Sequence, residues 1–224
     1  MITVHHLNNS RSQRILWLLE ELELDYEIKR YQRDPETMLA PASLMKVHPL
    51  GKSPVVTDGS LTLAESGAII EYLVDTYDEQ GRLAPQRDTR DRLRYTYFLH
   101  YAEGSAMPPL LLRLVFDRIA EGPVPFFVKP VTRAISARVN NDFIQPQIDR
   151  HLDFLEGELS RRRWFAGRSF SAADIQMSFP LEAAASRGVI GDHRPKLTAF
   201  LDRIHARPAY QRALERGGEY ALGR

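Results

Sequence analysis

The sequence predicts a protein of two parts, an α/β domain followed by an all-helical domain. Two patterns lead to this fold class. Over residues 2–77, short strand-like stretches alternate with helical spacing of apolar side chains in the order βαβαββα. From residue 88 onward, nearly every apolar pattern has helical spacing. Residues 79–87 are polar and contain glycine and proline, as linkers do. We therefore expect domains over residues 1–78 and 88–224.

The first domain begins with a predicted strand, helix and strand. Residues 2–7 have the composition of a strand, and residues 12–23 place their leucines and isoleucine on one helical face. Residues 25–31 alternate as a second strand. Short connections in this order place the two strands parallel. The remaining predicted elements are a weak helix over 36–47, strands over 53–57 and 60–63 joined at Asp58-Gly59, and a helix over 65–77.

The second domain is predicted to consist of long helices. The pattern indicates a helix over 88–119 bent near Pro108-Pro109, a proline-rich loop over 122–130, a helix over 131–162 bent at Pro146, a helix over 171–186, and two helices flanking Pro208. Ser171 and Asp174 have the spacing of a capping box, for which we expect a structural role. Phe126 and Phe127 in the loop are candidates for a lid or a dimer contact.

Composition excludes several functions. The 224 residues carry 30 basic and 29 acidic side chains, a formal net charge of +1, which argues against nucleic acid as the main partner. There is no cysteine, so a cysteine nucleophile, a disulfide and a thiolate metal site are all excluded, and we expect no metal. The chain has neither a signal-peptide pattern nor an apolar run long enough to span a membrane. We expect a cytoplasmic protein without a membrane partner.

The first motif with chemical meaning joins the first strand to its helix. Ser10 lies where free backbone N–H groups and the positive end of the helix dipole favour an anion. A hydroxyl there could stabilise a negatively charged ligand atom. Ser10 and Gln13 also fit a capping box, which is the commoner meaning of this motif on its own.

Two further motifs suggest a peptide ligand. Ser53-Pro54 begins a predicted strand, where a cis proline would expose backbone groups for pairing with a peptide. Glu65 and Ser66 open a helix, where they could hold the charged ends of an amino acid. Each motif alone also has a purely structural reading, as an edge-strand proline and as an ordinary helix cap.

Together, and in this order, the motifs resemble those of soluble glutathione transferases. The segments Ser10-Arg11-Ser12-Gln13-Arg14, Pro49-Leu50-Gly51-Lys52-Ser53-Pro54 and Glu65-Ser66-Gly67 carry the resemblance, which extends over the whole chain. It implies a thioredoxin-like domain followed by a helical one. The serine-type members, theta-like and bacterial or fungal, are the most similar.

The resemblance implies roles for particular residues. Ser10 would hold the glutathione sulfur as a thiolate, with Asn9, Arg11 and Ser12 as assisting candidates and Asn8 as a further neighbour. Glutathione itself would be held by Lys52, Ser53, Pro54, Glu65 and Ser66. An apolar electrophile would lie against the long second-domain helix; the candidates are Tyr97, Tyr101, Met107 and Phe116. His5 and His6 are expected to be structural residues of the first strand.

The implied activity is transfer of glutathione to small electrophiles, as in detoxification, by a homodimer that uses glutathione as co-substrate and has no tightly bound cofactor. Two alternatives remain open from the sequence. One is a glutathione-dependent peroxidase or disulfide reductase that works without a protein thiol. The other is a scaffold or regulator that binds glutathione without catalysis.

Overall fold

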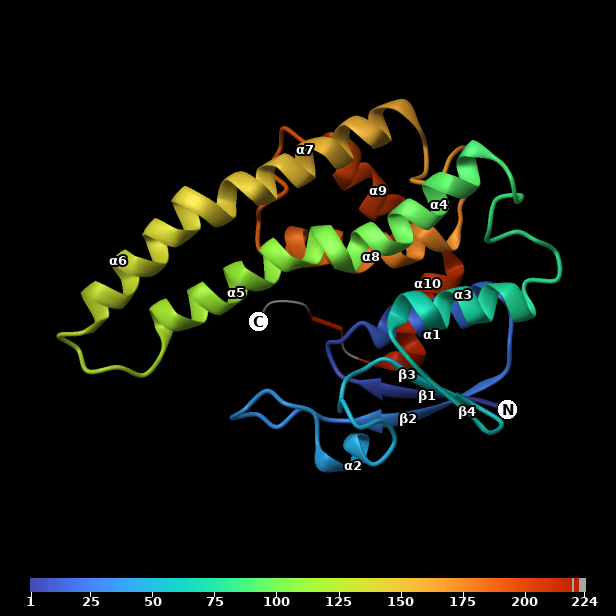
Figure 1. Cartoon of the computed structure of the whole chain (residues 1–224), viewed down its shortest axis with the longest axis horizontal. Coiled ribbons are helices and arrows are strands. Elements are labelled where there is room, and N and C mark those ends of the chain that lie inside the picture. Colours follow the sequence, from blue (N-terminus) through green and yellow to red (C-terminus); the bar gives the residue numbers. More distant parts are fainter. Residues whose placement is uncertain (219, 222–224) are drawn as a thin grey trace.

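The chain folds into a small α/β part and a larger helical part that lie against each other. The computed structural model describes residues 1–218, 220 and 221. Figure 1 shows the sheet on one side, helices α1 (Ser12–Glu21) and α3 (Ser66–Tyr77) above it, and the helical part beyond them. The order βαβαββα and the all-helical second half, both predicted from the sequence, are confirmed.

The sheet is mixed and has the strand order β2-β1-β3-β4. Strand β1 (Ile2–Leu7) pairs in parallel with β2 (Tyr26–Tyr31), as the short strand-helix-strand connections predicted. On its other side, β1 pairs antiparallel with β3 (Val55–Asp58), which forms a hairpin with β4 (Leu61–Ala64). This topology places the end of β1 beside the start of β3.

Helix α1 is buried on all sides. Its residues from Ser12 to Glu20 are all buried, the polar ones included. One face packs against the sheet, and the others meet α8 (Ala172–Ser186) and α10 (Pro208–Gly217) of the helical part. Trp17, fully buried on this helix, packs edge-on against Tyr210 of α10 at 5.2 Å between ring centroids. The cores of the two parts are therefore continuous.

The two long predicted helices are each divided by a π-helical turn. The first consists of α4 (Arg90–Tyr101), a π-helical turn (Ala102–Ala106) and α5 (Met107–Glu121); the second of α6 (Lys129–Val139), a π-helical turn (Asn140–Ile144) and α7 (Gln145–Arg161). In both, the prolines lie in the first turn after the π-helical segment, at Pro108-Pro109 and at Pro146. Proline has no backbone N–H to continue a helix, and at both places it follows the wider π-helical turn directly.

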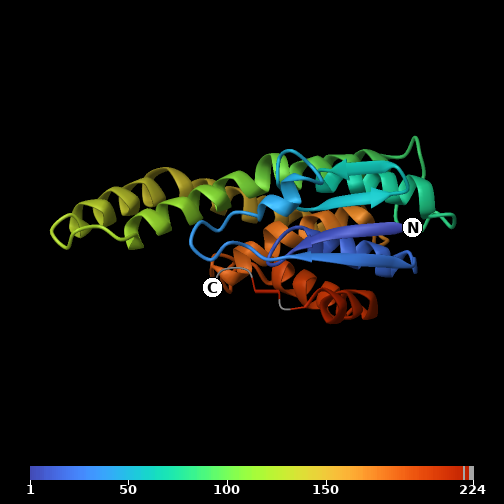
Figure 2. The same ribbon diagram turned by 90° about the horizontal axis from the view of Figure 1, so that it is seen from below.

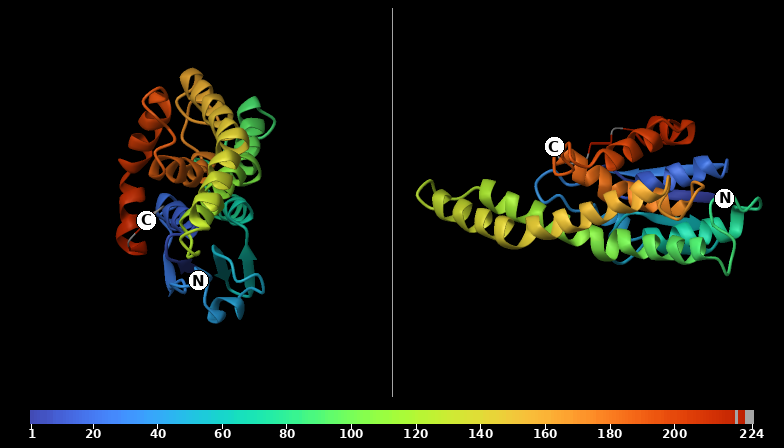
Figure 3. Two further views of the ribbon diagram at one scale, coloured as in Figure 1. Left: turned by 90° about the vertical axis from the view of Figure 1, so that its left-hand side faces the viewer. Right: turned by 90° about the horizontal axis from the view of Figure 1, so that it is seen from above.

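Helices α5 and α6 form a hairpin that projects beyond the rest of the molecule (Figures 2 and 3). Its tip is the predicted proline-rich loop, which the structure shortens because α6 already begins at Lys129. Phe126 and Phe127 at the tip are 85% and 68% exposed. We call the exposed apolar side chains of the two helices the arm stripe; they are Leu111, Leu112, Val115, Ile119, Val131 and Ile135.

The smaller elements differ from prediction in three places. The helix predicted over 36–47 is reduced to α2 (Ala42–Met45), which starts directly after Pro41. The Ser10–Gln13 capping box is absent: α1 begins at Ser12, and neither polar atom of the buried Gln13 side chain has a partner among the described residues. Helix α1 also ends two residues before the predicted position, at Glu21.

The capping box predicted at the start of α8 is present. One carboxylate oxygen of the fully buried Asp174 accepts hydrogen bonds from the backbone N–H and the hydroxyl of Ser171 at 2.9 and 3.2 Å. The other accepts from the backbone N–H of Phe165 at 2.9 Å. Burial raises the pKa of Asp174 to about 7 in spite of these bonds. Of the two helices predicted to flank Pro208, the first is α9 (Pro195–His205), and the second, α10, begins at Pro208 itself. Within the described part of the chain, no helix has the length and apolar character needed to cross a bilayer.

Candidate active site

A cleft of about 200 Å³ opens between the edge of the α/β part and the start of the arm. Loops from both parts build it: the turns before β3 and before α3, the N-terminal turn of α1, and the π-helical turn after α4. Its lining residues are Arg11, His48, Leu50, Lys52, Ser53, Pro54, Ala64, Glu65, Ser66 and Glu103. All five residues predicted to hold glutathione therefore meet in one place.

The Ser53-Pro54 segment forms one wall of the cleft. The peptide bond between the two residues is cis, and β3 begins at the next residue. The hydroxyl of Ser53 donates to the backbone carbonyl of His5 on β1 at 3.1 Å, which ties the turn to the neighbouring strand. Lys52 lies next to this turn and is exposed, so its ammonium group is available to a carboxylate ligand.

Glu65 and Ser66, at the start of α3, lie beside this turn, because Val55 of β3 pairs with Ala64 of β4. Glu65 has φ 71° and ψ 116°, a conformation that is costly for a residue with a side chain and that clusters at ligand sites. α3 has no side-chain cap, so the alternative reading of this motif as an ordinary helix cap is wrong. The free N–H groups of this helix end are next to the cleft, where an anion would be favoured.

Ser10 lies one layer behind Ser53. It is only 4% exposed and is not a lining residue of the cleft. Its Oγ atom is 2.8 Å from the Oγ atom of Ser12 and 3.3 Å from that of Ser53. The backbone N–H of Ser12 also donates to it, at 3.2 Å. Ser10 thus belongs to a cluster of hydroxyl groups whose outer member, Ser53, faces the cleft.

The neighbours of Ser10 differ in availability. The Asn8 side chain accepts from the backbone N–H of Arg33 at 2.9 Å, and the Asn9 side chain accepts from that of Ala221 at 2.8 Å. Both side chains are therefore engaged away from the cleft. Of the assisting candidates, Arg11 is the one that lines the cleft.

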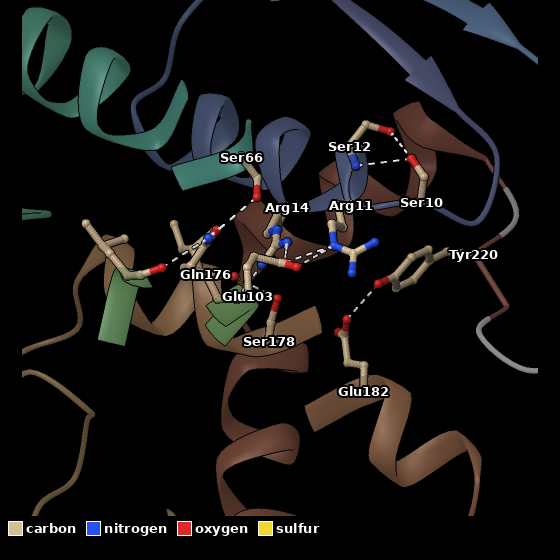
Figure 4. A network of polar contacts seen from close by, with 12 residues as sticks. Ser10, Arg11, Ser12, Arg14, Ser66, Glu103, Gln176, Ser178, Glu182 and Tyr220 are labelled. Carbon is tan, nitrogen blue, oxygen red and sulfur yellow. Dashed lines mark hydrogen bonds and ion pairs between the residues drawn. The ribbon is translucent and has the colours of Figure 1, made fainter. Parts of the chain in front are cut away.

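An ion-pair network forms the floor of the cleft, and Figure 4 shows its members. The carboxylate of Glu103 accepts from Nε of Arg11 at 2.8 and 2.9 Å and pairs with the fully buried guanidinium of Arg14. Arg14 also donates to the carbonyl of Gln176 on α8 at 2.5 Å. The network therefore connects α1 with both α8 and the π-helical turn that carries Glu103.

Burial and charge have opposite effects on this network. Burial alone would raise the pKa of Glu103, but Arg14 and Arg11 outweigh it and the pKa is lowered. Burial also lowers the pKa of Arg14, against the stabilising charge of Glu103. The carboxylate consequently stays ionised as the counterion of two guanidinium groups.

Two family models match the chain. The model described as "Glutathione S-transferase, N-terminal domain" matches residues 1–75, and the one described as "Glutathione S-transferase, C-terminal domain" matches residues 140–208. Two relatives that carry the same family name are 33% and 35% identical to this chain over 96% of its length. The chain belongs to the glutathione S-transferase family. As a member of this family it is a glutathione transferase, an enzyme for which glutathione is a substrate.

Named relatives agree with this membership. Glutathione S-transferase 1 of Saccharomyces cerevisiae is 33% identical over 225 residues, covering 96% of this chain and 95% of its own. Glutathione S-transferase 3 of Schizosaccharomyces pombe is 35% identical over 216 residues, covering 96% and 88%. A glutathione S-transferase structure from Actinobacillus pleuropneumoniae superposes with a TM-score of 0.78 at 34% identity, covering 99% and 94%. A sphingomonad glutathione S-transferase solved with glutathione has a TM-score of 0.73 at 26% identity, covering 96% and 98%.

The four residues suggested for the electrophile lie elsewhere in this transferase. The rings of Tyr97 and Tyr101 pack against Phe154 of α7, and the Tyr101 hydroxyl is 2.6 Å from Nδ1 of His151. Met107 is buried, and Phe116 packs against the core inside the arm. Among the residues that the structure describes, none of the four lines the cleft. Tyr97 and Tyr101 lie on α4, before the π-helical turn that carries the cleft residue Glu103.

Glu103 and His48 line the cleft but were not predicted as site residues. His48 lies in the Pro49-Leu50-Gly51-Lys52 turn, so its closeness to Lys52 was a usable signal. Glu103 gave no such signal, because it is far from the other site residues in sequence. In the described part of the chain, no group of three or more histidine or acidic side chains is arranged to hold a metal ion.

Proposed function

We propose that this glutathione transferase is of the serine type and uses Ser10 to hold the glutathione sulfur as a thiolate. The observation that carries the proposal is the hydroxyl cluster in which Ser10 stands 3.3 Å behind Ser53, at the edge of the cleft. A peptide ligand that pairs with the backbone at Ser53 and Pro54 would place its central residue beside this cluster. If the Ser10 hydroxyl rotates from Ser53 toward the sulfur, it can donate a hydrogen bond to the thiolate.

The charges of the cleft suit the two ends of glutathione. Lys52 would pair with the glycine carboxylate, and Glu65 with the amino group at the γ-glutamyl end. Ser66, at the start of α3, would receive the carboxylate of that end together with the free N–H groups of the helix. The tripeptide would then extend from Lys52 past Pro54 to Glu65.

The energy required of Ser10 is within reach of one hydrogen bond. A free thiol has a pKa of about 8.5, and lowering it by about two units requires about 2.7 kcal/mol of selective stabilisation of the thiolate. A hydrogen bond to a charged group contributes about 1.5–3 kcal/mol, and a helix N-terminus adds about 0.3–1 kcal/mol. Ser10 acts as a donor here, and the thiolate attacks a small apolar electrophile.

Turnover of an activated aryl chloride by the full-length protein tests the transferase function. We expect saturable kinetics in glutathione, and Lys52→Ala should raise the KM for glutathione about fivefold, since an exposed charge pair contributes up to about 1 kcal/mol. Lys46→Ala is the matched control, because Lys46 is exposed on the same segment but outside the cleft. Glutathione binding by calorimetry without turnover of any electrophile would favour a non-catalytic role instead.

We also propose the domain boundaries 1–78 and 88–224 with a linker over 79–87, a cytoplasmic location, and a homodimer. The domain boundaries are supported by the ends of the helices and strands. The cytoplasmic location is supported by the absence of cysteine. The homodimer is supported by the arm stripe, whose six apolar side chains are each 40% to 56% exposed. A second copy would cover that patch by a two-fold contact.

The solution mass of the protein tests the homodimer. We expect about twice the chain mass of 25.7 kDa, and a shift toward the monomer in the double variant Val115→Glu/Ile135→Lys, which places charges in the arm stripe. Leu39→Lys is the control, because Leu39 is 61% exposed but lies far from the arm in the chain. A monomeric native protein would contradict the homodimer, and an unchanged dimer in the double variant would place its interface elsewhere.

A further inference from the structure

A chain of hydrogen-bonding groups leads from the hydroxyl cluster into the core. Nδ1 of His6 is 2.9 Å from Oγ of Ser12, which is 2.8 Å from Oγ of Ser10. Ser10 in turn donates to Ser53 at 3.3 Å, and Ser53 donates to the carbonyl of His5. His6 and Ser12 are 5% and 0% exposed, so solvent takes no part at the inner end. Figure 4 shows the Ser10–Ser12 contact beside Arg11.

The number of available protons determines which group donates and which accepts in each of these hydrogen bonds. Each serine hydroxyl has one proton to donate, and each of the short contacts needs one proton between its two atoms. When the Ser10 hydroxyl donates its hydrogen bond to a bound sulfur, it can no longer donate to Ser12. Ser12 must then be the donor in the Ser10–Ser12 contact. The Ser12–His6 contact then requires the proton of His6 Nδ1. The order of donation is therefore His6, Ser12, Ser10, sulfur.

The environment of His6 keeps its ring neutral. Burial, the largest effect, and the charge of Arg30 lower its pKa to about 4, although hydrogen bonding with the backbone of Gly217 acts in the opposite direction. A neutral ring has a single N–H, for which the Ser12 hydroxyl, 2.9 Å from Nδ1, and the Gly217 backbone compete. A bound sulfur favours the form with the proton on Nδ1, because Ser12 must then donate to Ser10 and can only accept from His6. Among the described residues, the Ser12 hydroxyl can also donate to the carbonyl of Leu7 at 3.4 Å. If His6 did not donate to Ser12, the Ser12 hydroxyl could donate to the Leu7 carbonyl instead. Its oxygen would then accept the hydrogen bond of Ser10, and Ser10 would no longer donate to the sulfur.

We propose that His6 is a positioning residue of the nucleophile site, which donates to Ser12 and thereby directs the hydroxyl of Ser10 to the glutathione sulfur. The inference rests on the proposed role of Ser10. It gives His6 a task beyond the structural one expected from its place in β1. His6 does not touch the ligand; it acts through Ser12. Aligned donors also polarise one another, which strengthens the last hydrogen bond of the chain.

The pKa of the enzyme-bound thiol, read from the ultraviolet absorbance of the thiolate across pH, tests this role. His6→Leu should raise that pKa by about 0.5 to 1 unit. At pH values well below the thiol pKa, kcat should fall about three- to tenfold, because the thiolate fraction falls by that factor there. The KM for glutathione should not change, since His6 lies outside the cleft. His6→Asn should stay close to the native enzyme, because its amide N–H can donate from nearly the same place.

Two further measurements separate this inference from its alternatives. In a Ser12→Ala background, His6→Leu should have no further effect; a full effect there would overturn the proposal. Nitrogen NMR of the native enzyme with glutathione should find the His6 proton on Nδ1, and an unprotonated Nδ1 would overturn it even if every variant failed to fold. A thiol pKa that responds to Ser10→Ala but not to His6→Leu would reject only the role of His6, whereas no response to Ser10→Ala would reject the serine assignment itself.

Discussion

Replacing Ser10 by alanine is expected to lower kcat/KM for an activated aryl chloride by about 10- to 100-fold at neutral pH. The variant loses the hydrogen bond to the thiolate, which is worth about 1.5–3 kcal/mol, and a factor of ten corresponds to about 1.4 kcal/mol. The pKa of the bound thiol should rise by about one to two units for the same reason. Steady-state kinetics across pH and thiolate absorbance measure both effects.

The matched variants for this experiment are Ser10→Thr and Ser43→Ala. Threonine keeps the hydroxyl and should retain most of the activity. Ser43 is an exposed serine on α2, so its loss should leave the kinetics unchanged. If Ser10→Ala has the native rate and thiol pKa, the serine assignment is wrong. Arg11 would then be the next donor to examine, because it is the assisting candidate that lines the cleft.

Replacing Glu103 by alanine is expected to lower the free energy of unfolding by about 3–5 kcal/mol. The carboxylate pairs with the fully buried Arg14 and with Arg11, and removing one partner of a buried ion pair leaves an uncompensated charge in the core. Urea denaturation followed by circular dichroism measures the loss. Asp142→Ala is the control: its partner Arg138 is 84% exposed, so we expect a change below about 0.5 kcal/mol.

A second substitution checks the cause of this loss. If the unpaired guanidinium is responsible, adding Arg14→Met to Glu103→Ala should recover part of the stability, because an apolar side chain of similar length needs no counterion. If the two residues act independently, the free-energy losses of Glu103→Ala and Arg14→Met will add in the double variant. That result would contradict this explanation.

The parts of the fold that follow from local sequence were predictable. The strand composition of β1, the alternation in β2, the Asp58-Gly59 turn and the Ser171–Asp174 box are each determined by a few neighbouring residues. The structure contains all of these elements. The predicted helix over 36–47 failed for a local reason too, since Pro41 disfavours helical geometry in the residue before it. Neither π-helical turn could be predicted, because such turns leave no periodic signal of their own.

The candidate site also contains both residues that local sequence predicted and residues that only the fold brings to the cleft. The five predicted glutathione-binding residues lie in two short segments, and the structure brings both to one cleft. Glu103 reaches the same cleft from a distant helix, in a position set by a π-helical turn. The role inferred for His6 also needed the structure, because only the pairing of its ring with Ser12 distinguishes it from His5, whose ring meets Tyr31 at 2.9 Å.

Helix α1 follows the turn that carries Ser10, and the sheet, α3, α8 and α10 enclose it on all sides. If the two parts were separated, the apolar surface that α1 buries against α8 and α10 would be exposed to solvent. The two parts should therefore melt in a single cooperative transition, and the connecting segment does not serve as a hinge. We therefore expect a shift of α8 or α10 to displace the turn that carries Ser10, because both helices pack directly on α1.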